Sequence, residues 1–529
     1  MPTFAKRAAA DSDTGSRFAL IDTERSLSWE EVDETLNRCA NLLLAADLGE
    51  NRRVAIFAEN AAEVALAHLG ALLAGASSVP VNFHLTAEEA AYILADSEAA
   101  VLFVGPETVE RGLVAAKAAG VPTVIGWGCD GHDSLGGDLS DWTTWLQDGD
   151  TTDPPDDVVP KPNLLYTSGT TGRPKGTELP PTMFAGGATM AEHLAELAAR
   201  PQVQLGTHLV VGPMYHTGPL AGMRLLAGGQ SSVILGKFDA ETTLAAIDRY
   251  EIASATMVPT HFVRLLALPD EVKQRYDVSS MQMCACTGAR LPVDVMGAMI
   301  EWFGPVFRDA YGATEVGTVC TISSPEWLEH PGSIGQTVPP FTALVFDENM
   351  NELPAGEEGR LYFRDSTGRG IIYPNDPEKT AASNPEPGLF TLGEIGYMDA
   401  DGYVYVTDRF SDMVVSGGVN LYPAEAEQLL IDHPAVADVA CIGVPHPEMG
   451  EELRALVIAE DPASPPTGDE LGPWLRERLS HYKCPRSYEV VSDLGRNTMG
   501  KINKRRLRDT YLASIEGLAS IEGLASTEG

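Results

Sequence analysis

Positive charge is scarce in this sequence. Its 529 residues include 37 lysines and arginines against 75 aspartates and glutamates, which gives a net charge of −38 with neutral histidines. A chain of this charge repels nucleic-acid phosphates and anionic lipid headgroups unless a local cationic cluster meets them. We therefore expect no nucleic-acid partner. Residues 496–508 hold the one basic run without an acid, which either faces a phosphate or lies on a solvated helix face.

Cysteine and long apolar segments are also sparse. The seven cysteines are an odd number, and Cys284 and Cys286 lack the second pair that a zinc site needs, which favours reduced thiols. Residues 1–21 contain no apolar core long enough for a signal peptide. The stretch from Val64 to Ala87 has no formal charge, but its polar residues favour a buried helix followed by a strand over a membrane span. We expect a cytoplasmic protein without a membrane partner.

Hydrophobic periodicity predicts an α/β fold. A helix begins after Ser28, which forms a capping-box pattern with Glu31, and helices and strands then alternate. This alternation is typical of parallel sheets covered by helices on both faces, in doubly wound subdomains. The expected helices are 28–46, 62–74, 87–94, 424–432 and 469–480, and the expected strands are 54–57, 78–81, 100–104, 121–125, 360–363, 403–406, 437–444 and 454–460.

The same pattern divides the chain. We expect an N-terminal domain over residues 1–408, made of two α/β subdomains at about 1–160 and 161–330 and a small β subdomain at 331–408. A smaller α+β lid domain follows at 409–511. Residues 512–529 repeat a short unit containing glycine and are too simple to form a core, so we expect a flexible tail there.

A hydroxyl- and glycine-rich loop follows an apolar strand at residues 165–176. Small residues let backbone N–H groups approach an anion, hydroxyls add donors, and Lys175 adds charge. The loop differs from a Walker A motif because Pro174 precedes the lysine and Gly176 follows it. The residues that we expect to cradle phosphate are Thr167, Ser168, Gly169, Thr170, Thr171, Gly172 and Lys175.

This loop resembles the signature of the adenylate-forming superfamily of acyl-CoA synthetases, peptide-synthetase adenylation domains and firefly luciferases. Four further segments resemble later motifs of the superfamily in the expected order. They are Tyr311–Glu315, Gly393–Glu394, Asp408–Arg409 and Gly500–Lys501. The resemblance covers nearly the whole chain. It implies a large N-terminal α/β domain that includes a small β-barrel, and a mobile α+β C-terminal lid.

The resemblance also implies ATP as a substrate and Mg²⁺ as a cofactor. It assigns adenine stacking to Tyr311, the metal to Glu315, and stabilisation of the transition state to Lys501. Glu394, where relatives usually have Asp, and Arg409 would bind ribose, and Ser411 takes the hinge position where many relatives carry Lys or Asp. The other residues of the implied nucleotide site are Gly288, Ala289, Arg290, Asp309, Ala310, Gly312 and Thr314.

The segment Met214–Leu220 resembles the wall of the acyl pocket in this family. It places His216 beside the reacting carboxyl group, to orient the acid or accept a proton, with a merely packed imidazole as the alternative. Lys483 either faces the site after the lid rotates or is a surface lysine. Small pocket residues imply room for a bulky aromatic acid. The expected pocket residues are Tyr215, His216, Cys286, Gly288, Ala313, Val316, Gly317 and Thr318.

The acyl acceptor is the least determined part of the reaction. The chain as a whole resembles the amide bond synthetases that couple acids of the β-carboline-3-carboxylate type to amines. A CoA ligase is the alternative, because residues 416–423 resemble the segment that lines the thiol channel in such ligases. A non-catalytic nucleotide-binding module would have little need of Lys175, Glu315 and Lys501 together. The sequence leaves the oligomeric state open.

Substitution of Lys501 by alanine tests the implied chemistry. A carboxylate that approaches the α-phosphate of ATP to about 4 Å meets a repulsion of about 4 kcal/mol at an effective dielectric near 20. The lysine offsets this repulsion, so we expect pyrophosphate release by the variant to fall by roughly 10²–10³-fold. Equal rates of pyrophosphate release by the variant and the wild-type protein would show that the assignment of Lys501 is wrong.

Overall fold

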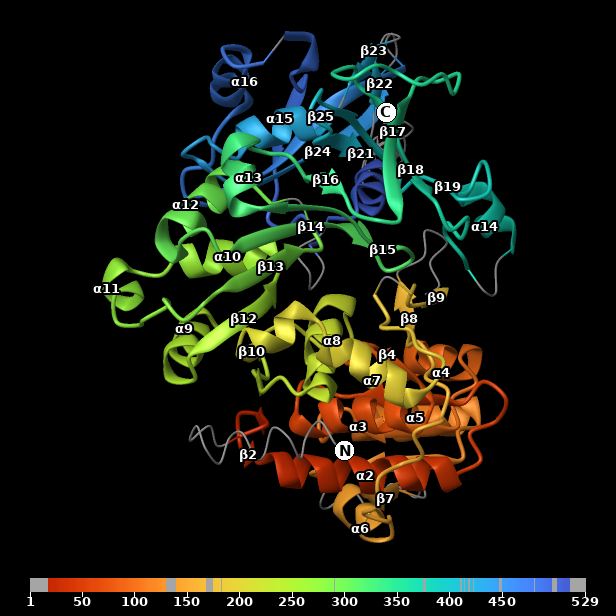
Figure 1. Cartoon of the computed structure of the whole chain (residues 1–529). Helices are drawn as coiled ribbons and strands as arrows, with labels where there is room; N and C mark the ends of the chain where they lie inside the picture. Colours follow the sequence, from red (N-terminus) through yellow and green to blue (C-terminus); the bar gives the residue numbers. More distant parts are fainter. Residues whose placement is uncertain are drawn as a thin grey trace, which may run out of the picture. The chain divides into compact units, whose positions relative to one another are not determined.

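The computed structural model describes two compact units (Figure 1). The first is formed within residues 1–332 and 369–388, and the second within residues 333–368 and 389–529. The domain boundary expected at residue 408 stays a prediction. The described residues are 18–129, 139–167, 175–181, 183–289, 291–373, 377–409, 412, 414–416, 419–421, 423–446, 450–479, 481–496 and 502–513.

A parallel sheet with the strand order β4-β3-β5-β6-β7 begins the first unit. Side chains of its strand β3 alternate between two cores: Val54 and Ile56 join the core that contains α2 and α3, whereas Ala55 and Phe57 join the core of α4 and α5. The expected parallel sheet with helices on both faces is therefore confirmed. The elements are α2 (Trp29–Ala45), β3 (Arg53–Phe57), α3 (Ala62–Leu73), β4 (Ser77–Val81), α4 (Ala87–Asp96), β5 (Val101–Val104), α5 (Val109–Ala119), β6 (Thr123–Gly126), β7 (Leu139–Asp141) and α6 (Trp142–Gln147).

Helix α2 begins as the sequence predicts. The Ser28 side chain accepts a hydrogen bond from the Glu31 N–H, and the Glu31 carboxylate accepts one from the Ser28 N–H at 2.7 Å. This reciprocal capping box satisfies backbone donors that the first helical turn would otherwise leave open.

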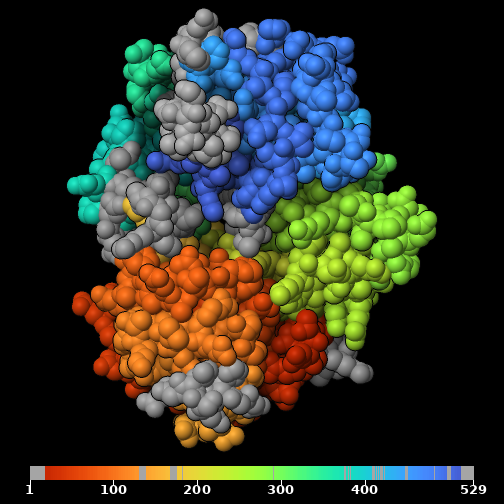
Figure 2. Space-filling model, turned by 180° about the vertical axis from the view of Figure 1, so that it is seen from behind, coloured from red at the N-terminus to blue at the C-terminus, as the bar shows by residue number. Residues whose placement is uncertain are grey.

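On the opposite side of the sheet, the orange segment that contains α4 and α5 forms a continuous part of the face seen in Figure 2.

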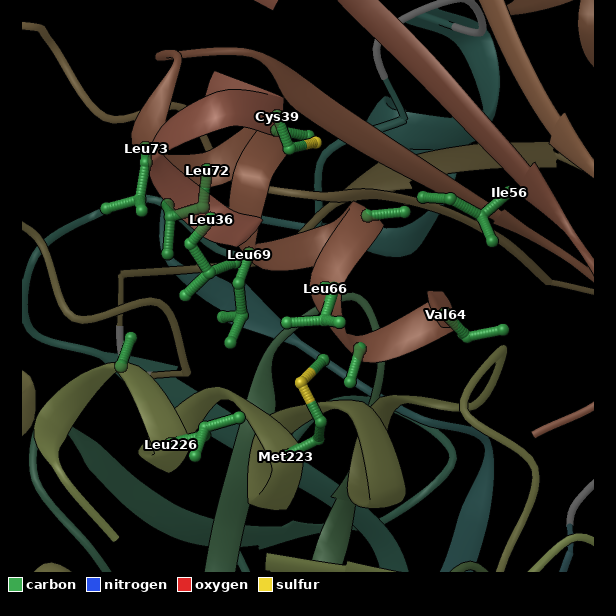
Figure 3. Close-up of a cluster of buried hydrophobic side chains, with 14 of the residues drawn as sticks. Leu36, Cys39, Ile56, Val64, Leu66, Leu69, Leu72, Leu73, Met223 and Leu226 are labelled. Carbon is green, nitrogen blue, oxygen red and sulfur yellow. The ribbon is translucent and has the colours of Figure 1, made fainter. Parts of the chain in front are cut away.

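Helix α3 is buried along its whole length. All 12 of its residues are buried, which confirms the expected buried helix in the uncharged stretch. Figure 3 shows its Leu66 and Leu69 facing Met223 and Leu226 from a second layer of helix. Against α2 the helix approaches so closely that a Cβ at Gly70 would overlap the Sγ atom of Cys39 and lie 2.9 Å from its Cβ. Glycine is required at this crossing because a larger side chain would not fit between the two helices.

The second sheet of the first unit has the strand order β15-β14-β13-β12-β10-β11-β1-β2. Neighbours from β1 to β14 run parallel, and β2 and β15 pair antiparallel with β1 and β14. Its strands and surrounding helices are β1 (Leu20–Ile21), β2 (Ser26–Leu27), α7 (Met190–Ala198), η2 (Pro201–Gln204), β10 (Thr207–Val210), α8 (Thr217–Met223), η3 (Arg224–Gly228), β11 (Ser232–Ile234), α9 (Ala240–Arg249), β12 (Ile252–Met257), α10 (Pro259–Leu266), α11 (Asp270–Lys273), β13 (Met283–Thr287), α12 (Val293–Phe303), β14 (Phe307–Ala313), β15 (Gly317–Ser323) and α13 (Ser324–Glu329).

Three further elements complete the first unit. Strands β8 (Leu164–Thr167) and β9 (Lys175–Glu178) form an antiparallel hairpin, and α14 (Pro377–Ser383) belongs to the returning segment 369–388. Asn384 fixes that segment, because its side chain donates to the Ile371 carbonyl at 2.8 Å and accepts from the Ile371 N–H at 2.9 Å.

The second unit contains two sheets. In one, β17, β18, β20 and β21 pair antiparallel in that order, and β19 also pairs with β18. In the other, β22, β23, β24 and β25 pair antiparallel, and β26 runs parallel to β25. The elements are β16 (Gln336–Thr337), β17 (Phe341–Phe346), β18 (Gly359–Asp365), β19 (Leu389–Phe390), β20 (Glu394–Met398), β21 (Val404–Arg409), β22 (Val414–Ser416), β23 (Val419–Leu421), α15 (Pro423–Leu430), β24 (Val436–His446), β25 (Gly450–Ala459), α16 (Gly468–Arg476), η5 (His481–Lys483) and β26 (Ser487–Val490).

All seven cysteines lie in the described part of the chain and are reduced thiols, as expected. Six are buried, and Cys129 is partly exposed. Among the described residues, no helix is both long and apolar enough to cross a membrane. The expected cytoplasmic location stays a prediction.

Substitution of Gly70 by alanine tests the close packing of α2 on α3. Alanine normally stabilises a helix by about 1 kcal/mol relative to glycine. Here the added methyl group would overlap Cys39, so we expect a loss of about 1–3 kcal/mol, measured as a lower melting temperature or denaturation midpoint. The double variant C39A/G70A should recover part of the loss.

The matched control is Gly297→Ala in α12, where a new Cβ would meet no atom within 4 Å. This variant should be neutral or more stable than the wild-type protein. If G70A were as stable as G297A, the close approach of α2 and α3 would be wrong.

Candidate active site

Hairpin β8–β9 carries both ends of the expected phosphate loop. Thr167 pairs with Lys175 across its two antiparallel strands, so the chain returns to within one strand spacing, about 5 Å, of where it left. Lys175 is thereby placed at the mouth of the loop. The residues between them, including Ser168, Gly169, Thr170, Thr171 and Gly172, lie outside the described residues, and their role as phosphate donors stays a prediction.

Two long-range polar contacts anchor this hairpin to the rest of the first unit. The Tyr166 hydroxyl donates to Oδ2 of Asp96, at the end of α4, at 2.7 Å. Burial and the neighbouring Asp96 carboxylate raise the pKa of Tyr166, so the phenol remains a donor. Arg53 of strand β3 forms an ion pair with Glu178 of β9 at 2.9 Å. The loop therefore starts and ends on strands that are fixed to the parallel sheet.

A second hairpin, β14–β15, presents the segment Tyr311–Glu315. Strand β14 ends at Ala313, and the Val316 N–H donates to the Ala313 carbonyl at 3.2 Å to close the turn. The pairing shifts register between Tyr311 and Gly312, and a Cβ at Gly312 would overlap the carbonyl oxygen of Gly317. Glycine is needed there so that the two backbones can approach.

The tip of this hairpin meets the expected acyl segment. His216 is the residue that precedes α8, and Thr217 is the first residue of that helix. The Thr217 hydroxyl oxygen lies 3.1 Å from the hydroxyl oxygen of Thr314, which precedes Glu315. The His216 ring packs against the Tyr215 ring with centroids 4.2 Å apart. The structure thus brings together two motifs that are 97 residues apart in the sequence.

Asn60 holds the loop that leads to His216. Its side-chain amide donates to the carbonyl of Gly212 at 2.8 Å, and its side-chain oxygen accepts from the Met214 N–H at 2.8 Å. Asn60 was not expected from the sequence. A usable signal exists, because Asn60 follows the buried strand β3, and polar residues just beyond the carboxyl ends of parallel strands commonly serve a site.

Glu315 is held at its side chain and its backbone by the returning segment. The Tyr373 hydroxyl lies 3.4 Å from Glu315 Oε1, and Arg369 Nη1 donates to the Glu315 carbonyl at 3.2 Å. Tyr373 is itself 8% exposed. Neither residue was expected from the sequence. No local pattern marks them, since Arg369 and Tyr373 lie 54 and 58 residues from Glu315.

The donor set around Glu315 fits magnesium. Among the described residues, no group of three or more histidine, cysteine or acidic side chains could hold a metal ion. Mg²⁺ usually binds through one or two carboxylates and takes its other ligands from substrate phosphates and water. One oriented carboxylate at Glu315 therefore suits a magnesium ion that arrives with a nucleotide, and does not suit a permanently bound metal.

The expected adenine shelf lies on neighbouring strands β13 and β14. Across the two strands, Cys286 lies opposite Asp309 and Thr287 lies opposite Ala310. The Thr287 hydroxyl also donates a hydrogen bond to the Ala310 carbonyl at 2.8 Å. Burial raises the pKa of Asp309 to about 7, so its carboxyl group is partly protonated near neutral pH. Gly288 and Ala289 directly follow β13 beside this pair, whereas Arg290 lies outside the described residues.

The expected pocket residues gather at one edge of the second sheet. Strands β10, β13 and β14 run parallel in this sheet, so their carboxyl ends lie at the same edge. This edge carries the segments that follow β10 and β13, and the tip of hairpin β14–β15. Cys286 is 0% exposed and Val316 2% exposed. Tyr215, His216, Gly288, Ala313 and Thr318 are partly buried, and Gly317 is buried. Their contact with an acyl group stays a prediction.

The second unit places the expected ribose residues opposite each other. Glu394 begins β20, Arg409 ends β21, and the two pair across these antiparallel strands. Glu394 is 6% exposed. Ser411 and Lys501 lie outside the described residues, so their roles as hinge residue and catalytic lysine stay predictions.

Several basic residues of the second unit form ion pairs with acids of that unit. Lys483 of η5 forms an ion pair with Glu425 of α15. In the described part of the expected basic run 496–508, three basic side chains pair with acids. Those pairs are Arg496 with Asp438 at 2.6 Å, Lys504 with Glu427 at 2.9 Å and Arg508 with Glu451 at 2.6 Å.

Two family models match the chain, one over most of its N-terminal part and one near its C-terminus. The family described as AMP-binding enzyme matches residues 6–370, and the AMP-binding enzyme C-terminal domain matches residues 425–501. The chain is 33% identical over 500 residues to the feruloyl-CoA synthases of Amycolatopsis sp and Streptomyces sp, covering 92% of this chain and 94% of each relative.

Solved structures share the same fold. The ATP-bound MatB from Rhodopseudomonas palustris is 29% identical, with a TM-score of 0.77 and coverage of 96% of this chain and 98% of that one. The amide bond synthetase McbA from Marinactinospora thermotolerans has a TM-score of 0.78 over 96% of this chain and 99% of its own, but only 22% identity, so this likeness shows the fold alone. The chain belongs to the AMP-binding enzyme family of adenylate-forming ligases, with the large N-terminal α/β domain and smaller C-terminal domain of that family.

Proposed function

We propose that the protein joins a carboxylic acid to an acceptor in two steps, first forming an acyl-adenylate from ATP with release of pyrophosphate, and then transferring the acyl group to the thiol of CoA. The observation that supports the first step is the contact between Thr314 and Thr217, the chain neighbours of Glu315 and His216, at one edge of a parallel sheet. Ligands of open α/β sheets bind at such an edge.

The described residues divide the work of adenylation. Lys175, fixed at the end of hairpin β8–β9, supplies positive charge for the ATP phosphates. His216, held by the ordered loop before α8, orients the carboxylic acid or accepts a proton. Glu315 is the residue that would hold Mg²⁺, and the ion when bound would neutralise phosphate charge. Tyr373 keeps the Glu315 carboxylate in one orientation.

A thiol acceptor is favoured by the relatives. The feruloyl-CoA synthases that match over most of the chain are named for a thioester of an aromatic acid. An aromatic acid also agrees with the small residues Ala313 and Gly317 on hairpin β14–β15. We therefore take a bulky aromatic acid as the substrate class.

An amine is the second candidate for the acceptor. Residues 1–408 carry a net charge of −31, which repels the phosphates of CoA and favours a neutral or cationic acceptor. The product would then be an amide and AMP, for example from a β-carboline-3-carboxylic acid. A non-catalytic nucleotide-binding module is disfavoured, because a mere binder would have little use for an oriented Glu315 together with His216.

Product analysis separates the two acceptors. Ferulic acid and a β-carboline-3-carboxylic acid are each incubated with ATP and Mg²⁺, with CoA in one tube and phenethylamine in the other, and the products are identified by mass spectrometry. We expect a thioester with CoA, and only as much amide as spontaneous capture of released adenylate gives.

The opposite result, amide well above that background without thioester, would make the protein an amide bond synthetase. The Lys501→Ala variant is the control for ATP-dependent product. If no member of a panel of aromatic and aliphatic acids led to pyrophosphate release, adenylation itself would be wrong.

Replacement of Tyr373 by phenylalanine tests the positioning of Glu315. The variant loses the hydroxyl that contacts the carboxylate but keeps the ring that packs. We expect the Mg²⁺ concentration for half-maximal pyrophosphate release to rise by roughly 10-fold, since residues that orient a metal ligand typically contribute that much to metal affinity. The thermal stability should change little.

Tyr276→Phe is the matched control, because it removes another Tyr–Glu hydrogen bond, to Glu241 at 3.0 Å, outside the site. Its Mg²⁺ dependence should equal that of the wild-type protein. Identical Mg²⁺ dependence of Y373F and Y276F would refute the positioning role.

A further inference from the structure

A group of basic side chains lies in the interior of the first unit, away from the hairpins of the candidate site. Arg224 begins η3 directly after α8, His193 belongs to α7, and Arg200 follows that helix. Burial, with a further contribution from the charge of Arg224, lowers the pKa of His68 in the buried helix α3 to about 3. We call Arg224, His193, Arg200 and His68 the Arg224 cluster.

Arg224 is almost completely enclosed. It is 4% exposed, and its guanidinium carbon lies 4.7 Å from the centroid of the Phe184 ring. Its Nη2 is 3.3 Å from Nε2 of His193, whereas its Nη1 is buried without a hydrogen-bond partner among the described residues. Around it, η3 packs tightly on α7, since a Cβ at Gly228 would lie 3.0 Å from the Leu197 carbonyl. The Arg224 side chain is therefore largely shielded from bulk water.

His193 cannot balance the charge of Arg224. Its Nδ1 is 2.7 Å from the Gly186 carbonyl and must donate to it, so Nε2 accepts from the arginine and the ring is neutral. Burial, with further contributions from Arg224 and Arg200, lowers the pKa of His193 to about 4. The histidine orients one nitrogen of Arg224 and leaves the positive charge in place.

No acid in the described part of the chain balances Arg224 either. Its neighbours among the described residues are a neutral imidazole, an aromatic ring and a second arginine. Burial together with Arg200 lowers the pKa of Arg224 to about 9, so the guanidinium stays charged at neutral pH. Glu196 is exposed and interacts with Arg200. A buried charge is normally paired, because its desolvation is otherwise uncompensated.

We propose that Nη1 of Arg224 binds a small monovalent anion, a carboxylate or a halide, in the interior of the first unit between α7 and η3. Arginine recognises carboxylates through its planar fork, and the ring of Phe184 supports the guanidinium from its face. Two sources would supply this chemistry: a free anion from solution, or a second carboxylate at the far end of a dicarboxylic acyl substrate.

The second source rests on the proposed function. Helix α8 connects the two places directly, because His216 precedes its first residue and Arg224 follows its last. A helix of this length spans about 10 Å. An acid with a carboxylate at each end could therefore present one to the candidate active site and the other to Arg224.

Thermal unfolding in sodium bromide tests the site without any substrate. Bromide replaces a bulky sulfonate at constant ionic strength, so that general salt effects are held fixed. The wild-type protein should gain at least ~2 °C in melting temperature, because a ligand that binds only the folded state stabilises it. The variant Arg224→Met should show no gain, and Arg224→Lys should retain part of it.

The matched control is Arg249→Met. Arg249 also lies over an aromatic ring, that of Tyr250, with its guanidinium carbon 5.0 Å from the ring centroid, but it is exposed. The bromide effect should be unchanged in this variant. Crystals grown in bromide should show an anomalous peak beside the Arg224 guanidinium. Absence of both the wild-type gain and the peak would overturn the proposal, even if Arg224→Met failed to fold.

Pyrophosphate release with matched acids then separates the two sources. Dicarboxylic acids are compared with their monoesters at equal chain length, in the wild-type protein and Arg224→Lys. If the far carboxylate binds Arg224, the dicarboxylic acids should have at least ~10-fold lower KM, and the lysine variant should reduce this difference. Equal KM values together with bromide binding would identify a free anion. Failure of all adenylation would refute the proposed function while leaving the bromide result intact.

Discussion

The complete burial of helix α3 is the constraint on which the first unit depends. One side of the helix packs on α2, where Gly70 and Cys39 allow the closest approach, and another meets Met223 and Leu226 of the α8–η3 segment. The helix therefore lies between the layer of α2 and the layer of α8, which begins directly after His216. Because protein interiors are close-packed and transmit small displacements, a shift of α3 would move both layers.

The sequence predicts this layered fold well because its signals are local. The capping box at Ser28 and Glu31, the uncharged stretch of α3 and the alternating helices and strands each depend on residues within a few positions of one another. Membership in the adenylate-forming family also follows from local motifs, which keep their order along the chain. The acyl acceptor, thiol or amine, does not follow from these motifs, since enzymes with different acceptors share them.

The connections that orient the site could not be read from the sequence. The contacts of Tyr166 with Asp96 and of Tyr373 with Glu315 join residues 70 and 58 positions apart, and no spacing rule predicts such a pair. The same limit applies to Lys483, whose partner Glu425 lies 58 residues away. Motifs identify which groups take part in the chemistry, whereas the folded chain decides what holds each group in its orientation.

The distribution of the cysteines has a practical consequence for experiments on this protein. Six thiols are enclosed in the folded chain, and burial raises the pKa of Cys284 to about 12, so that little reactive thiolate forms. Cys129, next to strand β6, is the partly exposed one. Under native conditions a maleimide dye should attach mainly there, and the slower labelling of the other six thiols would report how often the folded chain opens.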